Sequence, residues 1–224
     1  MECSARRFAV ACGLALIWQA HGMAAPAHAG TASAPTAAAA SMHKWATLTA
    51  DHRGLPFVII DKRAARIWIY DRHGRLVESS PVLLGSAIGD GSVPGIGLRP
   101  LSQIRPEERT TPAGRFFLEA GHNPAGESIF WIDYEAAVSL HRVRSGRPGD
   151  RRLQRLATPS AADNRISYGC VNLPTAVYNR SIHPLFLPRG GYAYVLPEVV
   201  DMRRALPTLP PLGPPAPGPH HRAP

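Results

Sequence analysis

The sequence predicts a mainly β fold built from mixed strands with few short helices. Its apolar and β-branched segments are short, as at residues 57–60, and turn residues separate them. The 224 residues include 20 Gly and 23 Pro, a content that argues against a helical bundle or a coiled coil. A hydrophobic content of 45% is enough for a core and excludes a wholly disordered chain.

The strand assignments follow the chain in order. Residues 57–60 form a β-branched run, residues 66–70 alternate as Arg-Ile-Trp-Ile-Tyr, and a polar turn at 71–74 leads into a third strand at 76–77. This pattern predicts a meander of at least three strands. Further strands are expected at residues 81–84, 116–119, 130–134, 138–143 and 192–196. One helix is expected from Pro174 to about His183, because proline is tolerated in the first helical turn.

The first 29 residues are typical of a secretory signal peptide. Arg6 and Arg7 precede an apolar run at 8–18, and a small-residue stretch ends in Ala27-His28-Ala29 before Gly30. A run of eleven residues is shorter than the roughly 20 that span a bilayer, so no stable membrane insertion is expected after cleavage. We therefore expect export to the periplasm or cell wall.

The remaining chain divides by composition into three parts. Residues 30–50 are rich in Ala, Thr, Ser and Pro, and we interpret them as a linker. Residues 51–205 carry the periodic apolar segments and form the predicted domain. Residues 206–224 hold eight prolines without an apolar face, which predicts a disordered tail.

Removal of the signal peptide would leave a single cysteine. Cys3 and Cys12 lie within residues 1–29, so only Cys170 remains and no internal disulfide can form. A lone thiol in an exported protein has two interpretations. It is a small buried hydrophobic side chain, or it is a nucleophile activated by a nearby base.

A candidate base is needed for the second interpretation. His141 lies in the strand-like segment at 138–143, on the same face as Ser139 and Val143, where an imidazole has little structural reason to be. A structural histidine is the alternative, and His122 and His183 are the other candidate bases. The Gly- and Pro-rich segment at 85–112 matches no phosphate-binding loop; it is either a binding loop or a variable insertion.

Three ordered motifs carry a resemblance to a known family. The run Ser167-Tyr168-Gly169-Cys170-Val171-Asn172 resembles the active-site signature of YkuD-type L,D-transpeptidases. The Thr-Pro-Ala-Gly-Arg-Phe segment at 111–116 is similar to an element that precedes the catalytic region of that family, and the opening meander to Gly85 is similar to its first strands. The resemblance covers roughly residues 57–197.

The resemblance implies a YkuD-like β-sandwich or barrel in which a histidine and the motif cysteine face each other across a groove. Cys170 would be the nucleophile and His141 its base, oriented by a backbone carbonyl. The pocket residues would be Ser167, Tyr168, Gly169 and Asn172. Backbone N–H groups around Cys170 would form the oxyanion hole.

The sequence departs from the family pattern in three places. Tyr168 stands where many members have a second histidine, Asn172 where many have arginine, and Arg142 where glycine commonly follows the histidine. The separation of 29 positions from His141 to Cys170 also exceeds the usual spacing, and this insertion is rich in arginine. It is either a solvated basic face or a carboxylate-binding wall, in which case Arg142, Arg144 and Arg165 would bind substrate.

These observations lead to one expected function and two alternatives. We expect an exported cysteine L,D-transpeptidase that acts on peptidoglycan stem peptides through a Cys170 thioester, in cross-linking or cell-wall remodelling. The alternatives are an L,D-carboxypeptidase with water as acceptor and a non-catalytic wall-binding module of the same fold. No cofactor and no metal are expected, since the histidines lack zinc-ligand spacing, and a nucleic-acid partner is not expected for an exported protein.

Overall fold

The computed structural model describes residues 33–206, and the expected signal peptide and nearly all of the expected tail lie outside this range. The fold is mainly β, as the sequence predicts. Eight strands form one mixed sheet in the order β3-β2-β1-β10-β5-β6-β7-β9, and β4 pairs with β8 in a second sheet. The large sheet comprises β1 (Phe57–Asp61), β2 (Arg66–Tyr70), β3 (Leu76–Pro81), β5 (Gly114–His122), β6 (Ser128–Asp133), β7 (Val138–Arg142), β9 (Val171–Leu173) and β10 (Gly191–Leu196).

Two parallel pairs interrupt an otherwise antiparallel large sheet. The first and last strands of the chain meet where β1 runs parallel to β10, and β7 runs parallel to β9 with His141 opposite Asn172. The small sheet is also parallel, with β4 (Leu84–Gly85) beside β8 (Arg165–Ser167). Both β8 and β9 flank the Cys170 turn, so the second parallel pairing places that turn next to β7.

The central strands are buried on both faces, which explains their continuous apolar runs. In β1, Val58 and Ile60 point into one core cluster with residues such as Phe130 and Leu140. The alternate residues Phe57 and Ile59 point into a second cluster on the opposite face. The same alternation occurs in β2 and β10.

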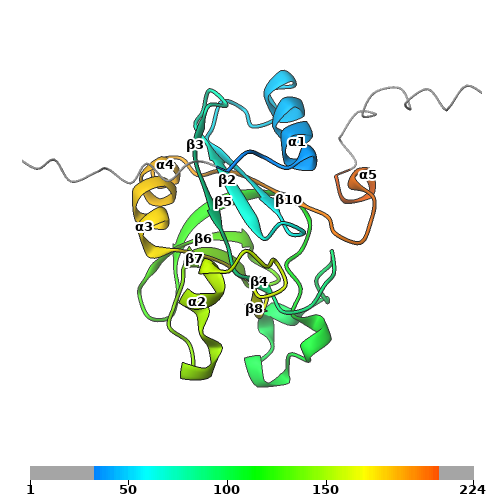
Figure 1. The fold of residues 1–224 in the computed structure, drawn as a ribbon, viewed down its shortest axis with the longest axis vertical. Coiled ribbons are helices and arrows are strands. Elements are labelled where there is room, and N and C mark those ends of the chain that lie inside the picture. Colours follow the sequence, from blue (N-terminus) through cyan, green and yellow to red (C-terminus); the bar gives the residue numbers. More distant parts are fainter. Residues whose placement is uncertain (1–32, 207–224) are drawn as a thin grey trace, which may run out of the picture. The chain divides into compact units, whose positions relative to one another are not determined.

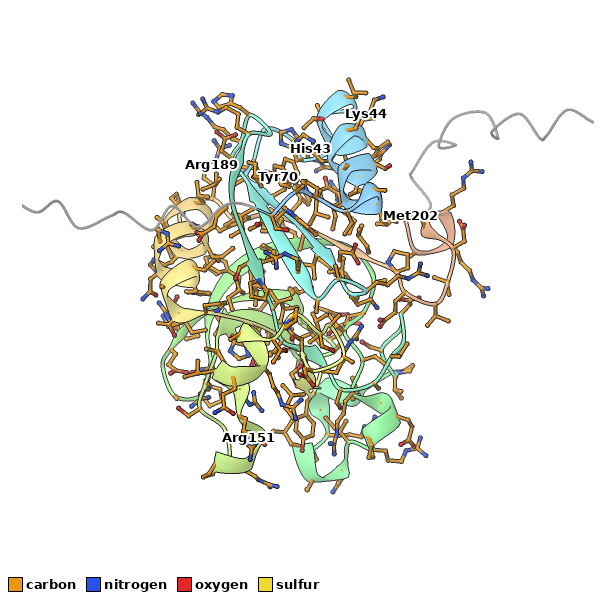
Figure 2. All side chains as sticks on the ribbon, in the orientation of Figure 1. His43, Lys44, Tyr70, Arg151, Arg189 and Met202 are labelled. Carbon is orange, nitrogen blue, oxygen red and sulfur yellow. The ribbon has the colours of Figure 1, made fainter. Side chains whose placement is uncertain are left out.

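The linker interpretation of residues 30–50 is wrong for its larger part, because α1 (Ala37–Leu48) covers the second cluster. Met42 and Trp45 of this helix pack on the aromatic face formed by Phe57, Trp68, Tyr70, Tyr192 and Tyr194. Thr36 caps the helix by accepting the Ala39 N–H at 3.1 Å, and its hydroxyl donates to Asp61 at 2.7 Å. Figure 2 labels His43 and Tyr70, whose rings stack between α1 and β2 with centroids 4.5 Å apart.

The other helices are short, as Figure 1 shows. The expected helix at 174–183 is present in broken form as α3 (Thr175–Val177), a π-helical turn at Tyr178–Ile182 and α4 (His183–Phe186). The remaining helical segments are α2 (Arg152–Ala157), α5 (Met202–Ala205) and four 3-10 turns at Ile96–Leu98, Leu101–Gln103, Pro106–Glu108 and Pro148–Asp150. Among residues 33–206, no helix has the length and apolarity needed to cross a membrane.

Candidate active site

The turn that carries Cys170 is fixed by its own motif residues. Ser167 Oγ donates to the carbonyl of Cys170 at 2.7 Å and accepts the Gly169 N–H at 3.1 Å. Gly169 has φ +132°, and a Cβ at this position would lie 2.8 Å from the Thr110 carbonyl oxygen. Only glycine adopts this conformation without strain, so the residue before the cysteine is dictated by the turn.

A buried threonine ties this turn to the rest of the fold. Thr111 Oγ1 donates to the Gly169 carbonyl at 2.8 Å and accepts the Gly85 N–H at 2.9 Å. The Thr111 carbonyl in turn accepts a hydrogen bond from Lys62 Nζ at 2.8 Å. The Thr-Pro-Ala-Gly segment thus holds the backbone on the N-terminal side of Cys170.

Cys170 is half-buried, and its sulfur faces polar groups of the β6–β7 turn and β7. The Ser139 N–H points at Sγ from 3.5 Å, Ser139 Oγ lies 3.6 Å from it, and the thiol lies 3.7 Å from the Ala137 carbonyl. Burial alone would raise the pKa of the Cys170 thiol. The hydrogen bond and charge of His141, together with the Ser139 donors, outweigh burial and hold that pKa below its ordinary value.

His141 is oriented for proton transfer by two hydrogen bonds. Its Nδ1 lies 2.7 Å from the Arg142 carbonyl oxygen, which can only accept, so Nδ1 carries the proton. The lone pair on Nε2 then accepts a long hydrogen bond from Asn172 Nδ2 at 3.3 Å, which has to give way when Nε2 takes a proton. In this tautomer Nε2 can accept the proton of a thiol.

A cavity of about 500 Å³ opens beside this pair. Its lining comes from β7, the arginine-rich insertion, the Cys170 turn and the 85–112 segment. These residues are Leu101, His141, Arg144, Gly146, Arg152, Ser167, Tyr168, Cys170 and Asn172. The set holds a thiol, an imidazole and two guanidinium groups, and none of its members is a carboxylate.

A second cavity, of about 490 Å³, adjoins the site through Ala137. It is lined by Gly95, Gly97, Leu98, Trp131, Tyr134, Glu135 and Ala137. The 85–112 segment therefore contributes to the walls of both cavities, with Leu101 in the first and residues 95–98 in the second. Its position is that of a wall of the site, in keeping with the binding-loop interpretation.

The structure brings most of the candidate residues together, but two of the arginines lie elsewhere. Arg142 stacks on the Tyr178 ring at 4.2 Å and donates to Asn179, on the face of β7 opposite His141. Arg165 pairs with Glu198 and donates to the Lys62 carbonyl. Only Arg144 of the three lines the cavity, so the expected substrate contacts of Arg142 and Arg165 are not supported by their placement.

The alternative bases are also distant from the cavity lining. His122 is exposed at the end of β5, and His183 packs near Tyr178 at a centroid distance of 6.3 Å. Sequence reasoning missed Ser139, Thr111 and Arg152 as site residues. The alternation of β7 already placed Ser139 on the His141 face, whereas Arg152 and Thr111 reach the site only through tertiary contacts.

The described residues contain no group of three or more His, Cys, Asp or Glu side chains suited to hold a metal ion. The Cys170 thiol and the His141 imidazole both line the cavity. Their arrangement supports nucleophilic attack by a thiolate on an electrophilic carbon.

The sequence matches no known protein-family profile and no curated protein. Solved structures similar to the chain include the catalytic domain of an L,D-transpeptidase from E. faecium, with 18% identity and a TM-score of 0.36 over 62% of this chain and 95% of that one. An L,D-transpeptidase from Stackebrandtia nassauensis has 14% identity and a TM-score of 0.37, over 63% of this chain and 55% of its own.

A third similar structure is the helical cell shape determining protein Pgp2 from Campylobacter jejuni. It has 14% identity and a TM-score of 0.41, over 66% of this chain and 49% of its own length. The chain thus spans about half the length of the second and third structures.

Proposed function

We propose that this chain is an exported cysteine L,D-transpeptidase of the periplasm or cell wall that acts on peptidoglycan stem peptides. The observation that carries the proposal is that Cys170 and His141 line one cavity, with His141 lowering the pKa of the Cys170 thiol, within the motif that resembles the YkuD-type signature. A wall-binding module would have no use for a thiol whose pKa is lowered by a neighbouring imidazole.

The reaction starts with transfer of the Cys170 proton to His141 Nε2. The thiolate then attacks the carbonyl carbon of the amide between diaminopimelate and the terminal D-Ala, forming the S–C bond. Collapse of the tetrahedral intermediate breaks the C–N bond, and His141 returns the proton to the departing amine of D-Ala. A thioester to Cys170 remains.

The oxyanion of the intermediate needs backbone donors beside the sulfur. The Gly169 N–H already donates to Ser167 Oγ, so we assign this role to the N–H of Cys170 itself. Ser167 and Asn172 then support the turn, because both donate to the Cys170 carbonyl, at 2.7 and 3.2 Å.

The fate of the thioester separates the two enzymatic outcomes. An amine of a neighbouring stem would give a cross-link, whereas water would give an L,D-carboxypeptidase. Both share the acylation half-reaction, so the first experiment addresses that half alone. The purified protein is incubated with a carbapenem, and its intact mass is measured.

A gain of one drug mass, mapped by peptide analysis to Cys170, is the expected result. The matched control is Cys170→Ser, which retains the shape of the side chain but has a far weaker nucleophile. A parent protein that gains no mass, or gains it outside the Cys170 peptide, would contradict the proposal and favour the wall-binding module.

A further inference from the structure

One arginine of the insertion is held in the cavity more firmly than the others. Arg152 donates through Nε to Asp150 Oδ2 at 3.1 Å and through Nη1 to Asn172 Oδ1 at 3.1 Å. Its side chain is 17% exposed. Arg144 is 55% exposed, and its only ion pair among the described residues is with Glu127 at 3.5 Å.

We propose that Arg152 is the anchor for a ligand carboxylate in the cavity that contains Cys170. The guanidinium already has a fixed orientation, so little side-chain entropy is lost when an anion binds. Within residues 33–206 its recorded hydrogen bonds use Nε and Nη1. Its Nη2 donors are therefore free of partners in that part of the chain and are available to a carboxylate oxygen.

The charge of the cavity selects for an anion. Arg144 and Arg152 both line it, and no carboxylate does. Asp150 and Glu127, which pair with Arg152 and Arg144, lie outside the lining, so the guanidinium groups and not the carboxylates face the cavity. A small anionic group entering next to the sulfur meets a positive field in partly desolvated surroundings.

Asn172 connects this anchor to the reacting pair. Because Arg152 donates to Asn172 Oδ1, the amide nitrogen is turned toward His141 Nε2 and the Cys170 carbonyl. The anchor and the nucleophile therefore have a fixed mutual position through one buried side chain. Arg152 is thus assigned as a specificity-determining residue that binds a substrate carboxylate. That the substrate is a stem peptide rests on the proposed function.

The test uses two alkylating probes that differ in charge. Iodoacetate carries a carboxylate and iodoacetamide does not, and with each the Cys170 thiolate forms an S–C bond as the C–I bond breaks and iodide leaves. Peptide mass analysis measures the alkylation rate of Cys170 with each probe. The readout is the iodoacetate rate divided by the iodoacetamide rate, normalised to the same ratio for free cysteine. Any change in thiolate content affects both probes and cancels.

The parent is expected to show a normalised ratio at least about fivefold above one, and Arg152→Gln is expected to lower it at least about fivefold. Arg152→Lys keeps the charge but lacks the planar guanidinium group, so it should give an intermediate ratio. This variant replaces Arg152→Gln in the test if Arg152→Gln fails to fold. The control is Arg151→Gln, an exposed neighbour that is labelled in Figure 2.

Equal ratios in the parent and Arg152→Gln would overturn the assignment. So would an equal fall in Arg151→Gln, because the effect would then come from the general basic charge. The measurement needs no peptidoglycan. If the carbapenem adduct is absent while Arg152→Gln still lowers the ratio, the proposed function fails and the carboxylate anchor stands.

Discussion

His141 and Asn172 lie directly opposite each other on the parallel strands β7 and β9, with Asn172 Nδ2 3.3 Å from His141 Nε2. Asn172 is fully buried, and its amide also donates to the Cys170 carbonyl at 3.2 Å. The strand register thus places the His141 imidazole next to the Cys170 turn despite the long insertion between them. The 28 intervening residues loop out through α2 and return as β8.

The first prediction concerns the nucleophile. Cys170→Ala should abolish carbapenem labelling and release of D-Ala from muropeptides, because no other thiol lies in the described domain. The contacts of Sγ with Ser139 and the Ala137 carbonyl are long, at 3.5 to 3.7 Å, so the free energy of unfolding should change by less than about 1 kcal/mol. Thermal denaturation measures the second effect. If Cys170→Ala is unfolded and the parent protein shows no activity, the thiol has a structural role instead.

The second prediction concerns the pH dependence of the thiol. His141 lowers the pKa of Cys170, so in the parent the thiolate persists at pH values below the ordinary pKa of about 8.5. Without the imidazole, burial remains and raises the pKa. His141→Ala should therefore slow iodoacetamide alkylation near neutral pH about tenfold or more, with the rate recovering as pH rises. His122→Ala, at an exposed position, is the control.

The third prediction concerns the turn before the nucleophile. Gly169→Ala places a Cβ 2.8 Å from the Thr110 carbonyl oxygen and 3.2 Å from Val138 Cγ2, at φ +132°. Such strain costs about 1 to 3 kcal/mol, and the turn would relax by moving Cys170. Denaturant unfolding should show this loss together with slower labelling. Gly149→Ala is the matched control, since nothing lies within 4 Å of its added Cβ; equal stability of the two variants would refute the steric argument.

Sequence patterns predicted those parts of the fold that carry their own periodicity. The strands β1, β2, β7 and β10 each show an apolar alternation or run, and the structure has a strand at each place. The strands β4, β8 and β9 have only two or three residues each, too few for a period, and they form because neighbouring segments pair with them. The composition around α1 is typical of a linker, but its alanines have high helix propensity and its apolar face packs on the second cluster.

The candidate site divides along the same line. Cys170 and His141 could be proposed from residue type and local context, because a lone thiol and a strand imidazole are each unusual. Which arginine enters the cavity depends on the path of the insertion, and no local signal separates Arg152 from Arg151 or Arg155. The position of Arg142 outside the cavity agrees with the β7 alternation, because Arg142 is on the same face of the strand as Leu140, which packs into the core.

The fourth prediction concerns the buried cation behind the site. Lys62 is fully buried and contacts Asp90 at 2.7 Å and Glu198 at 3.4 Å. Lys62→Met removes the cation and leaves two buried carboxylates, which should cost about 3 to 5 kcal/mol in denaturant unfolding at neutral pH. A loss below about 1 kcal/mol would show that the attraction between Lys62 and the carboxylates is offset by the cost of desolvating the charges.

The same pair predicts an acid dependence of stability. Burial opposes ionisation of Asp90, but Lys62 and three backbone N–H donors lower the pKa of Asp90 to about 2. A lowered pKa adds stability that is fully present above the unfolded value of about 3.9 and is lost as pH falls through about 2. The unfolding free energy of the parent should therefore fall between about pH 4 and pH 2. In Asp90→Asn this contribution should be absent; an unchanged acid slope would assign it to other carboxylates.

The last prediction concerns Thr111, whose single hydroxyl links Gly85 and Gly169 in a fully buried position. Thr111→Val keeps the shape and removes both hydrogen bonds. The Gly85 N–H and the Gly169 carbonyl are then left without this partner, at about 1 to 3 kcal/mol each. Because Gly169 precedes Cys170, the loss should also misplace the thiol relative to His141 and raise its pKa. The pH midpoint of Cys170 alkylation should therefore shift upward in Thr111→Val and return toward the parent value in Thr111→Ser, which restores the hydroxyl. A variant that is destabilised with an unchanged midpoint would show that Thr111 supports the fold without positioning the nucleophile.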